Sequence, residues 1–190
     1  MNMKRGFTLI ELVITVGILA LLSSMTLPSL RKYQRQMDAK VAAQELRTSI
    51  LQAQSYALAP RVSYTGKTPI SNYALYLDRS VLPHTYKIME NYGVVDAGGA
   101  SLQAEVPGTK HILPENLSFD SFGWVNPASS QAAIVFSTAG SVGRGKIDYV
   151  ASKWTTDANA VITIENSIDS SANWQVTINK ITGVLDVSQL

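Results

Sequence analysis

The sequence predicts an α+β fold in which one long N-terminal helix packs against a β-rich region. Residues 7–59 are dominated by good helix formers, and Pro28 is the only proline among them. After Pro60 the composition changes to segments rich in β-branched and aromatic residues, separated by turn residues. A helix followed only by strands is typical of an α+β domain rather than of alternating βαβ units.

The first half of this helix is apolar enough to cross a membrane. The run from Phe7 to Leu27 is almost wholly apolar, and about 20 such residues span a hydrocarbon core about 30 Å thick. Glu11 is the only formally charged residue in the run. A charge inside a bilayer is unfavourable by at least about 2.5 kcal/mol, so Glu11 either reaches the interface or has a partner and a function.

The N-terminal residues resemble the class III leader of type IV pilins and type II secretion pseudopilins. The resemblance is carried by the basic residues Lys4 and Arg5 and by the string Gly6-Phe7-Thr8-Leu9-Ile10-Glu11-Leu12-Val13. In that family a prepilin peptidase cuts after the glycine, here Gly6, and N-methylates the new first residue, here Phe7. The family's glutamate, here Glu11, assists assembly by meeting the amino-terminal charge of a neighbouring subunit.

The resemblance implies a non-enzymatic structural subunit of a type IV pilus or a type II secretion pseudopilus, with a pilin-like fold. The implied partners are other pilin or pseudopilin subunits, the prepilin peptidase, the inner-membrane assembly platform and, before assembly, membrane lipid. It also implies a single-pass protein of the inner membrane with a cytoplasmic N-terminus and an extracytoplasmic head. The charges do not decide this orientation, because basic residues flank the apolar run on both sides.

Three further segments resemble minor pseudopilins and minor pilins of the GspH/FimT type, with less specificity. They are residues 51–57, 134–141 and 176–185. The implied division of the chain is a leader at 1–6, a transmembrane and filament-core helix at 7–30, its amphipathic continuation at 31–59 and a β-rich head at 60–190. A different class stays open, in which a single-pass anchor carries a β-rich binding module that keeps its leader and never polymerises.

The second half of the predicted helix, residues 31–59, has one apolar face. Small and apolar residues recur there at steps of three and four, namely Ala39, Ala43, Leu46, Ile50, Ala53 and Ala57. We expect this face to pack on the head. In the first half, Gly17 and Pro28 weaken a helix and mark the points where it could bend or partly unwind in a packed filament.

Six segments after Pro60 predict strands, several of them with the alternation of half-buried antiparallel strands. They are residues 73–77, 86–89, 132–136, 146–150, 160–164 and 174–178. Residues 96–99, 126–130 and 166–173 are rich in turn formers and predict loops.

Composition and motifs argue against an enzyme, a cofactor or a bound metal. The chain has no cysteine, which excludes a disulfide framework, a thiolate nucleophile and a cysteine metal site. His84 and His111 lack a ligand pattern and are expected at the surface or in turns. No Gly-x-Ser-x-Gly elbow and no calcium-binding loop is recognisable.

Charge and spacing leave only a weak candidate for nucleic-acid binding. The chain carries 16 Lys and Arg against 14 Asp and Glu, and beyond Tyr33 the two signs nearly balance, so nucleic acid is not expected as a partner. Residues 140–146 are glycine-rich but lack Walker spacing, so they predict a flexible β-turn. Arg144 and Lys146 in this turn, with Lys153 or Lys180, are the residues that DNA uptake by a minor pilin would use.

Overall fold

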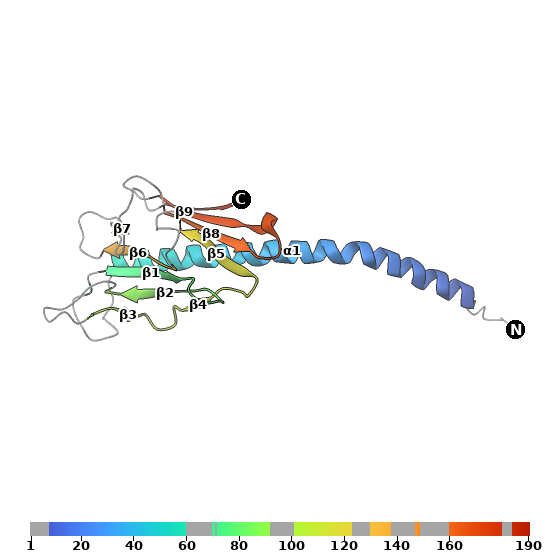
Figure 1. Ribbon diagram of the computed structural model, residues 1–190, viewed down its shortest axis with the longest axis horizontal. Helices are drawn as coiled ribbons and strands as arrows, with labels where there is room; N and C mark the ends of the chain where they lie inside the picture. Colours follow the sequence, from blue (N-terminus) through green and yellow to red (C-terminus); the bar gives the residue numbers. More distant parts are fainter. Residues whose placement is uncertain are drawn as a thin grey trace.

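The protein has one long helix and a β-rich head, as the sequence predicts. A computed structural model describes residues 8–59, 70, 72–91, 101–122, 130–137, 147–148, 160–179 and 184–190. Figure 1 shows that one half of the helix lies along the head and the other half projects far beyond it. The head contains only strands, one short 3-10 turn and connecting segments among the described residues, which confirms the α+β class.

Helix α1 (Leu9–Leu58) contains 50 residues and is about 75 Å long. Thr8 is its N-cap, with an extended backbone, and the Ala59 N–H donates to the Ser55 carbonyl at 3.0 Å at the other end. The predicted helix 7–59 is therefore confirmed to within a residue or two. Pro28 lies inside it, and the helix is continuous through this position in the isolated chain.

The described strands form two antiparallel sheets. The first has the order β3-β2-β1-β6-β7, with β4 also paired to β2, and the second has the order β10-β9-β8-β5. The first sheet consists of β1 (Asn72–Asp78), β2 (Thr85–Glu90), β3 (Ala104–Glu105), β4 (His111–Ile112), β6 (Gln131–Ser137) and β7 (Ile147–Asp148). The second consists of β5 (Leu117–Phe122), β8 (Ala160–Asn166), β9 (Trp174–Ile178) and β10 (Leu185–Gln189), with the 3-10 turn η1 (Ser170–Ala172) between β8 and β9.

The six predicted strands correspond to β1, β2, β6, β7, β8 and β9. The prediction missed β3, β4, β5 and β10. β3 and β4 have two residues each, too few to show a period, and the register of β5 shifts between Phe119 and Phe122, which breaks the alternation. The predicted loop at 166–173 overlaps the last residue of β8 and contains η1, whereas residues 96–99 and 126–129 lie outside the described residues.

The second half of α1 forms the centre of the core. Its buried residues are Ala39, Ala42, Ala43, Leu46, Ser49, Ile50, Ala53 and Ala57. This set contains every member of the predicted apolar face. Alanines on this face let the helix lie close to the strands, and α1 contacts strands of both sheets. Full burial of a Leu or Ile side chain stabilises the fold by about 1.5–3 kcal/mol, so this face ties the helix firmly to the head.

His84 was expected at the surface or in a turn, and it lies in the connection between β1 and β2 but is buried, so the surface alternative is wrong. His84 precedes β2, is 8% exposed, and accepts a hydrogen bond at Nδ1 from the Phe119 N–H at 2.9 Å. Phe119 belongs to β5 of the second sheet, so this bond joins the two sheets. Burial lowers the pKa of His84, and Arg79 lowers it further while Asp78 opposes the change. A neutral imidazole is therefore built into the head as a hydrogen-bond acceptor.

Candidate membrane and assembly site

Thr8 and Glu11 close the N-terminal end of α1 by binding each other. The Glu11 N–H donates to Thr8 Oγ1 at 3.4 Å, while Glu11 Oε2 accepts from the Thr8 N–H at 3.3 Å and from its hydroxyl at 3.2 Å. This is a capping box, which satisfies backbone donors that the first turn of a helix leaves without partners. A negative charge in the first turn also interacts favourably with the helix dipole. In the isolated chain, Glu11 therefore stabilises its own helix.

The large apolar side chains described in the first half of α1 are exposed rather than packed on the head. They run from Leu9 to Leu30 and are 53–80% exposed. The helix contains a stretch apolar enough to cross a membrane, and none of that stretch is buried within the described chain. A helix that is apolar on all sides is stable only when lipid or other protein surrounds it. The segment has the length and composition of a single membrane span and fits a membrane-anchored protein.

Gly17 lies in this exposed half, and its own molecule gives no reason for a glycine there. A Cβ atom placed on Gly17 would meet nothing within 4 Å. Glycine is also less favourable than alanine inside a helix, by about 1 kcal/mol. The packing of the described residues therefore does not require a glycine at position 17, and the predicted bend at Gly17 stays a prediction.

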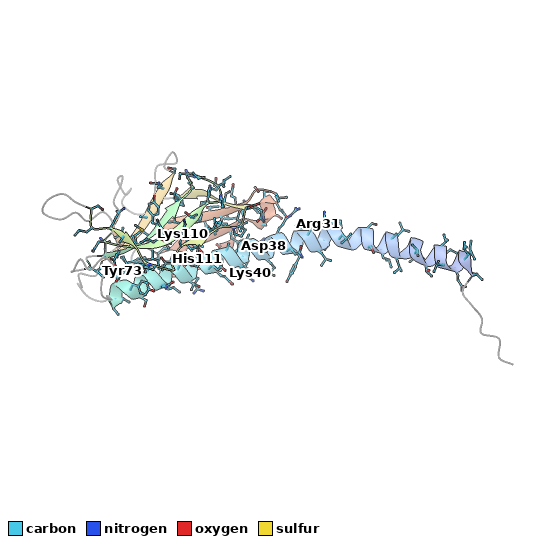
Figure 2. The ribbon with its side chains drawn as sticks, turned by 90° about the horizontal axis from the view of Figure 1, so that it is seen from below. Arg31, Asp38, Lys40, Tyr73, Lys110 and His111 are labelled. Atoms are coloured by element: carbon cyan, nitrogen blue, oxygen red, sulfur yellow. The ribbon has the colours of Figure 1, made fainter. Side chains whose placement is uncertain are left out.

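A pocket that the sequence did not reveal lies where α1 leaves the head. It lies between the helix and the turn that carries η1, and we call it the junction pocket. Figure 2 shows Arg31 near this point of the helix, with Asp38 and Lys40 further along beside the strands. Asp169 belongs to the loop between β8 and β9, so only the tertiary structure brings it to the basic residues of α1.

Other residues singled out in the sequence lie outside the described residues. These are Gly6, Phe7, Arg144, Lys146, Lys153 and Lys180. The cleavage site and the DNA-binding hypothesis therefore stay predictions.

His111 is partly exposed on β4, and its ring stacks on the ring of the buried Tyr86, with 5.0 Å between the ring centres. Burial is the main cause that raises the pKa of Tyr86. Among the described residues, no group of three His, Asp or Glu side chains is placed to hold a metal ion.

Comparison with known proteins agrees with the N-terminal features. Residues 1–27 match the family model of the prokaryotic N-terminal methylation motif. Comparisons with curated proteins and with solved structures gave no match. The GspH/FimT similarity therefore has no further support.

The match covers the basic leader, the capping box of Thr8 and Glu11, and nearly all of the exposed apolar half of α1. This motif marks precursors that a prepilin peptidase processes, in a family of structural subunits rather than enzymes. Residues 1–27 of this chain therefore carry the prokaryotic N-terminal methylation motif, which supports a type IV pilin-like precursor with a class III prepilin leader.

Proposed function

We propose that this protein is a structural subunit of a type IV pilus or a type II secretion pseudopilus, without enzymatic activity. The observation that carries the proposal is the methylation motif, which includes most of an apolar half-helix that the head leaves exposed. The apolar half would lie in lipid before assembly and against the helices of neighbouring subunits afterwards. The head, held on the other half of α1, would face outward from the filament.

Processing at a single peptide bond is the first step of this function. Prepilin peptidase would cut between Gly6 and Phe7 and methylate the new amine of Phe7, leaving Thr8 as the second residue of the mature chain. The mature amine then lies close to the first turn of α1. Positive charge at this end of a helix is unfavourable in the monomer, because it adds to the positive pole of the helix dipole.

Glu11 would gain a second partner during assembly. In the isolated chain its carboxylate caps the helix through Thr8. In the filament it would also face the Phe7 amine of a neighbouring subunit, in surroundings without water. Such a pair adds specificity, because a subunit in the wrong register leaves one charge buried without its partner. Gly17 and Pro28 would allow the local bending or unwinding that close packing of these helices requires.

The decisive experiment is mass spectrometry of the N-terminal peptide of the full chain, extracted from membranes of cells that contain the prepilin peptidase. We expect a chain that begins at N-methylated Phe7, and an intact leader in the Gly6→Val variant. An intact Met1 leader in the wild-type protein would refute the proposal and favour a membrane-anchored binding module. Normal processing of Gly6→Val would refute the assigned bond.

Two variants separate the charge of Glu11 from its capping role. Glu11→Gln keeps a capping-box acceptor but removes the charge, and Thr8→Val removes the capping hydroxyl but keeps the charge. We expect both to be processed, and only Glu11→Gln to fail to enter filaments that are sheared from cells and quantified by immunoblot. Filament entry lost in Thr8→Val and kept in Glu11→Gln would show that the cap, not the charge, is what assembly needs.

A further inference from the structure

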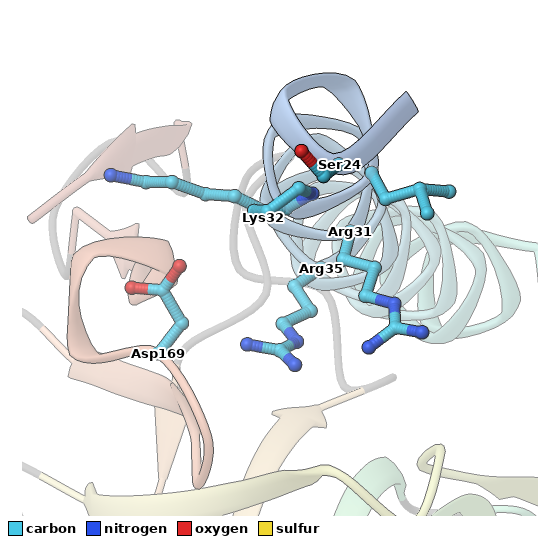
Figure 3. Close-up of a pocket in the computed structure, with 7 residues that line it drawn as sticks. Ser24, Arg31, Lys32, Arg35 and Asp169 are labelled. Carbon is cyan, nitrogen blue, oxygen red and sulfur yellow. The ribbon is translucent and has the colours of Figure 1, made fainter. Parts of the chain in front are cut away.

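The junction pocket has the size of a ligand site and a strongly basic lining. Its volume is about 470 Å³, within the range of small-molecule sites. The lining residues are Ser24, Leu27, Pro28, Arg31, Lys32, Arg35 and Asp169. Figure 3 shows the guanidinium groups of Arg31 and Arg35 on one side of the helix, with Asp169 on the facing turn. Three cations and one carboxylate leave the pocket with a positive charge.

The three basic side chains are not neutralised by ion pairs within the described part of the chain. The only ion pair there joins Lys87 to Glu105, 2.8 Å apart and elsewhere on the head. Arg31 and Arg35 are four residues apart, so they lie on the same face of α1 in adjacent turns. Two guanidinium groups so placed can bind an anion together.

Asp169 is fixed and ionised, and it does not fill the pocket. Its carboxylate caps η1 by accepting from the Ser171 N–H at 3.0 Å and the Ser171 hydroxyl at 2.6 Å. The buried Asn166 holds the same turn, because its Oδ1 accepts from the N–H groups of Ile168 and Asp169. The Ser171 bonds lower the pKa of Asp169, and Lys32 and Arg35 lower it further.

The position of the pocket along α1 matches the headgroup layer of a membrane. The apolar run ends at Leu27, and Leu30 is the last large apolar residue before the basic cluster, so Arg31 to Arg35 lie between about 1.5 and 7.5 Å beyond Leu30 along the helix axis. The headgroup layer on each side of a bilayer is about 5–7 Å thick. Leu27 is 53% exposed at the near edge of the pocket, where it can contact an acyl chain.

We propose that the junction pocket binds the phosphate of an anionic phospholipid in the leaflet nearest the head. Arg31 and Arg35 would donate to the phosphate oxygens, a geometry that guanidinium groups favour, and Lys32 would add charge from the neighbouring position. The bound headgroup would hold the head at a fixed height above the membrane before assembly. This inference rests on the membrane insertion in the proposed function, but not on cleavage or on filament formation.

The test uses the full chain in nanodiscs that contain equal amounts of phosphatidylglycerol and phosphatidylcholine. Native mass spectrometry after release from the disc measures which lipids stay bound. We expect the wild-type protein to retain phosphatidylglycerol in preference, and the Arg31→Gln/Lys32→Gln/Arg35→Gln variant to lose the preference. The expected loss is about fivefold for each charge removed.

Two variants make the test specific. Arg47→Gln removes a charge from an exposed position of the same helix, about 18 Å from Arg35 along the axis, and should keep the preference. Asp169→Asn removes the carboxylate but keeps a side chain that can cap η1, so it should strengthen phosphatidylglycerol binding. A gain of binding cannot result from a damaged fold.

Several outcomes would overturn the proposal. They are equal retention of the two lipids by the wild-type protein, an equal loss in Arg47→Gln and in the triple variant, and displacement of the lipid by millimolar inorganic phosphate. A triple variant that keeps phosphatidylglycerol but no longer enters filaments would instead assign the pocket to a protein contact. Selective lipid binding by a chain that cells never process at Gly6 would refute the proposed function and leave the lipid site standing. Failure of the wild-type chain to enter nanodiscs would overturn both.

Discussion

The two halves of α1 belong to one continuous helix but are built for different surroundings. From Leu9 to Leu30 the large apolar side chains are more than half exposed on every side. From Ala39 to Ala57 the buried residues lie on one face, most of them are alanines, and they pack on the two sheets. The described large apolar side chains of the first half are left exposed by the head, and the second half is central to the core.

The difference shows which part of the helix the head requires. Burial on the second half contributes to the stability of the folded head, whereas burial of the first half can occur only in lipid or in an assembly. A substitution should therefore affect folding in one half and membrane insertion or assembly in the other. The following predictions test this separation, from the largest expected effect to the smallest.

Leu46→Ala should destabilise the head strongly. Leu46 is 0% exposed, and truncation of a buried leucine costs about 2–5 kcal/mol through lost burial and the cavity left behind. The measurement is denaturant unfolding of the full chain in detergent, followed by tryptophan fluorescence. The matched variant Leu19→Ala, at a position 62% exposed, should change the unfolding free energy by less than about 0.5 kcal/mol. Equal losses in the two variants would contradict the separation of the halves.

Leu19→Asp should weaken membrane insertion without unfolding the head. A carboxylate near the middle of a membrane span is unfavourable by about 2.5–3.5 kcal/mol. The measurement is the fraction of the full chain that stays in the membrane pellet after alkaline extraction. Val41→Asp places the same charge at a position 50% exposed on the second half and should extract like the wild-type chain. Identical behaviour of Leu19→Asp and Val41→Asp would refute the membrane assignment of the first half.

Acid should lower the unfolding free energy of the head, and protonation of His84 should be the cause. The folded state lowers the pKa of His84 below its ordinary value of 6.5, so the unfolded chain binds the proton more readily. The stabilising effect is complete above about pH 6.5 and is lost as the pH falls through the folded pKa, with a slope of at most about 1.4 kcal/mol per pH unit. Asp78 and Asp169 have pKa values below 3.8, so they stay ionised between pH 7 and pH 5.

The control for this pH dependence is His84→Asn. Its Oδ1 can accept the Phe119 N–H in place of the imidazole Nδ1, but it does not titrate in this range. We expect the unfolding free energy of the wild-type chain to decrease from pH 7 to pH 5, and that of His84→Asn to change less. The same slope in both chains would remove His84 as the cause.

Lys40→Met should have the smallest effect. The Lys40 Nζ lies 5.9 Å from the centre of the Trp174 ring, so this cation–π contact joins the second half of α1 to β9. Loss of the contact should lower the unfolding free energy by about 0.5–1 kcal/mol. Arg47→Met, at an exposed position of the same helix, is the matched control. It should change the unfolding free energy by less than about 0.5 kcal/mol. A larger loss in Arg47→Met would mean that the polar face of the helix also holds the head.

Sequence reasoning succeeded where a feature depends on neighbouring residues. The helix, its buried face and the six strands have local periods, so they could be found without knowledge of the partners. β10 also alternates, with Leu185 and Val187 more buried than Asp186, and this signal could have identified it. The burial of His84 was missed because a single histidine beside a proline carries no period, and its contact with β5 joins residues distant in sequence.

The sequence by itself determined the leader motif, the membrane-length apolar run and the helical face that meets the head, since each is a pattern of residues close together in the chain. Only the tertiary structure decided how the strands divide between two sheets, that His84 accepts a bond across them, and that Asp169 faces Arg31, Lys32 and Arg35. The physical reason is that these features arise from contacts between residues far apart in sequence. Such contacts follow from the packing of the whole core, which no short segment specifies.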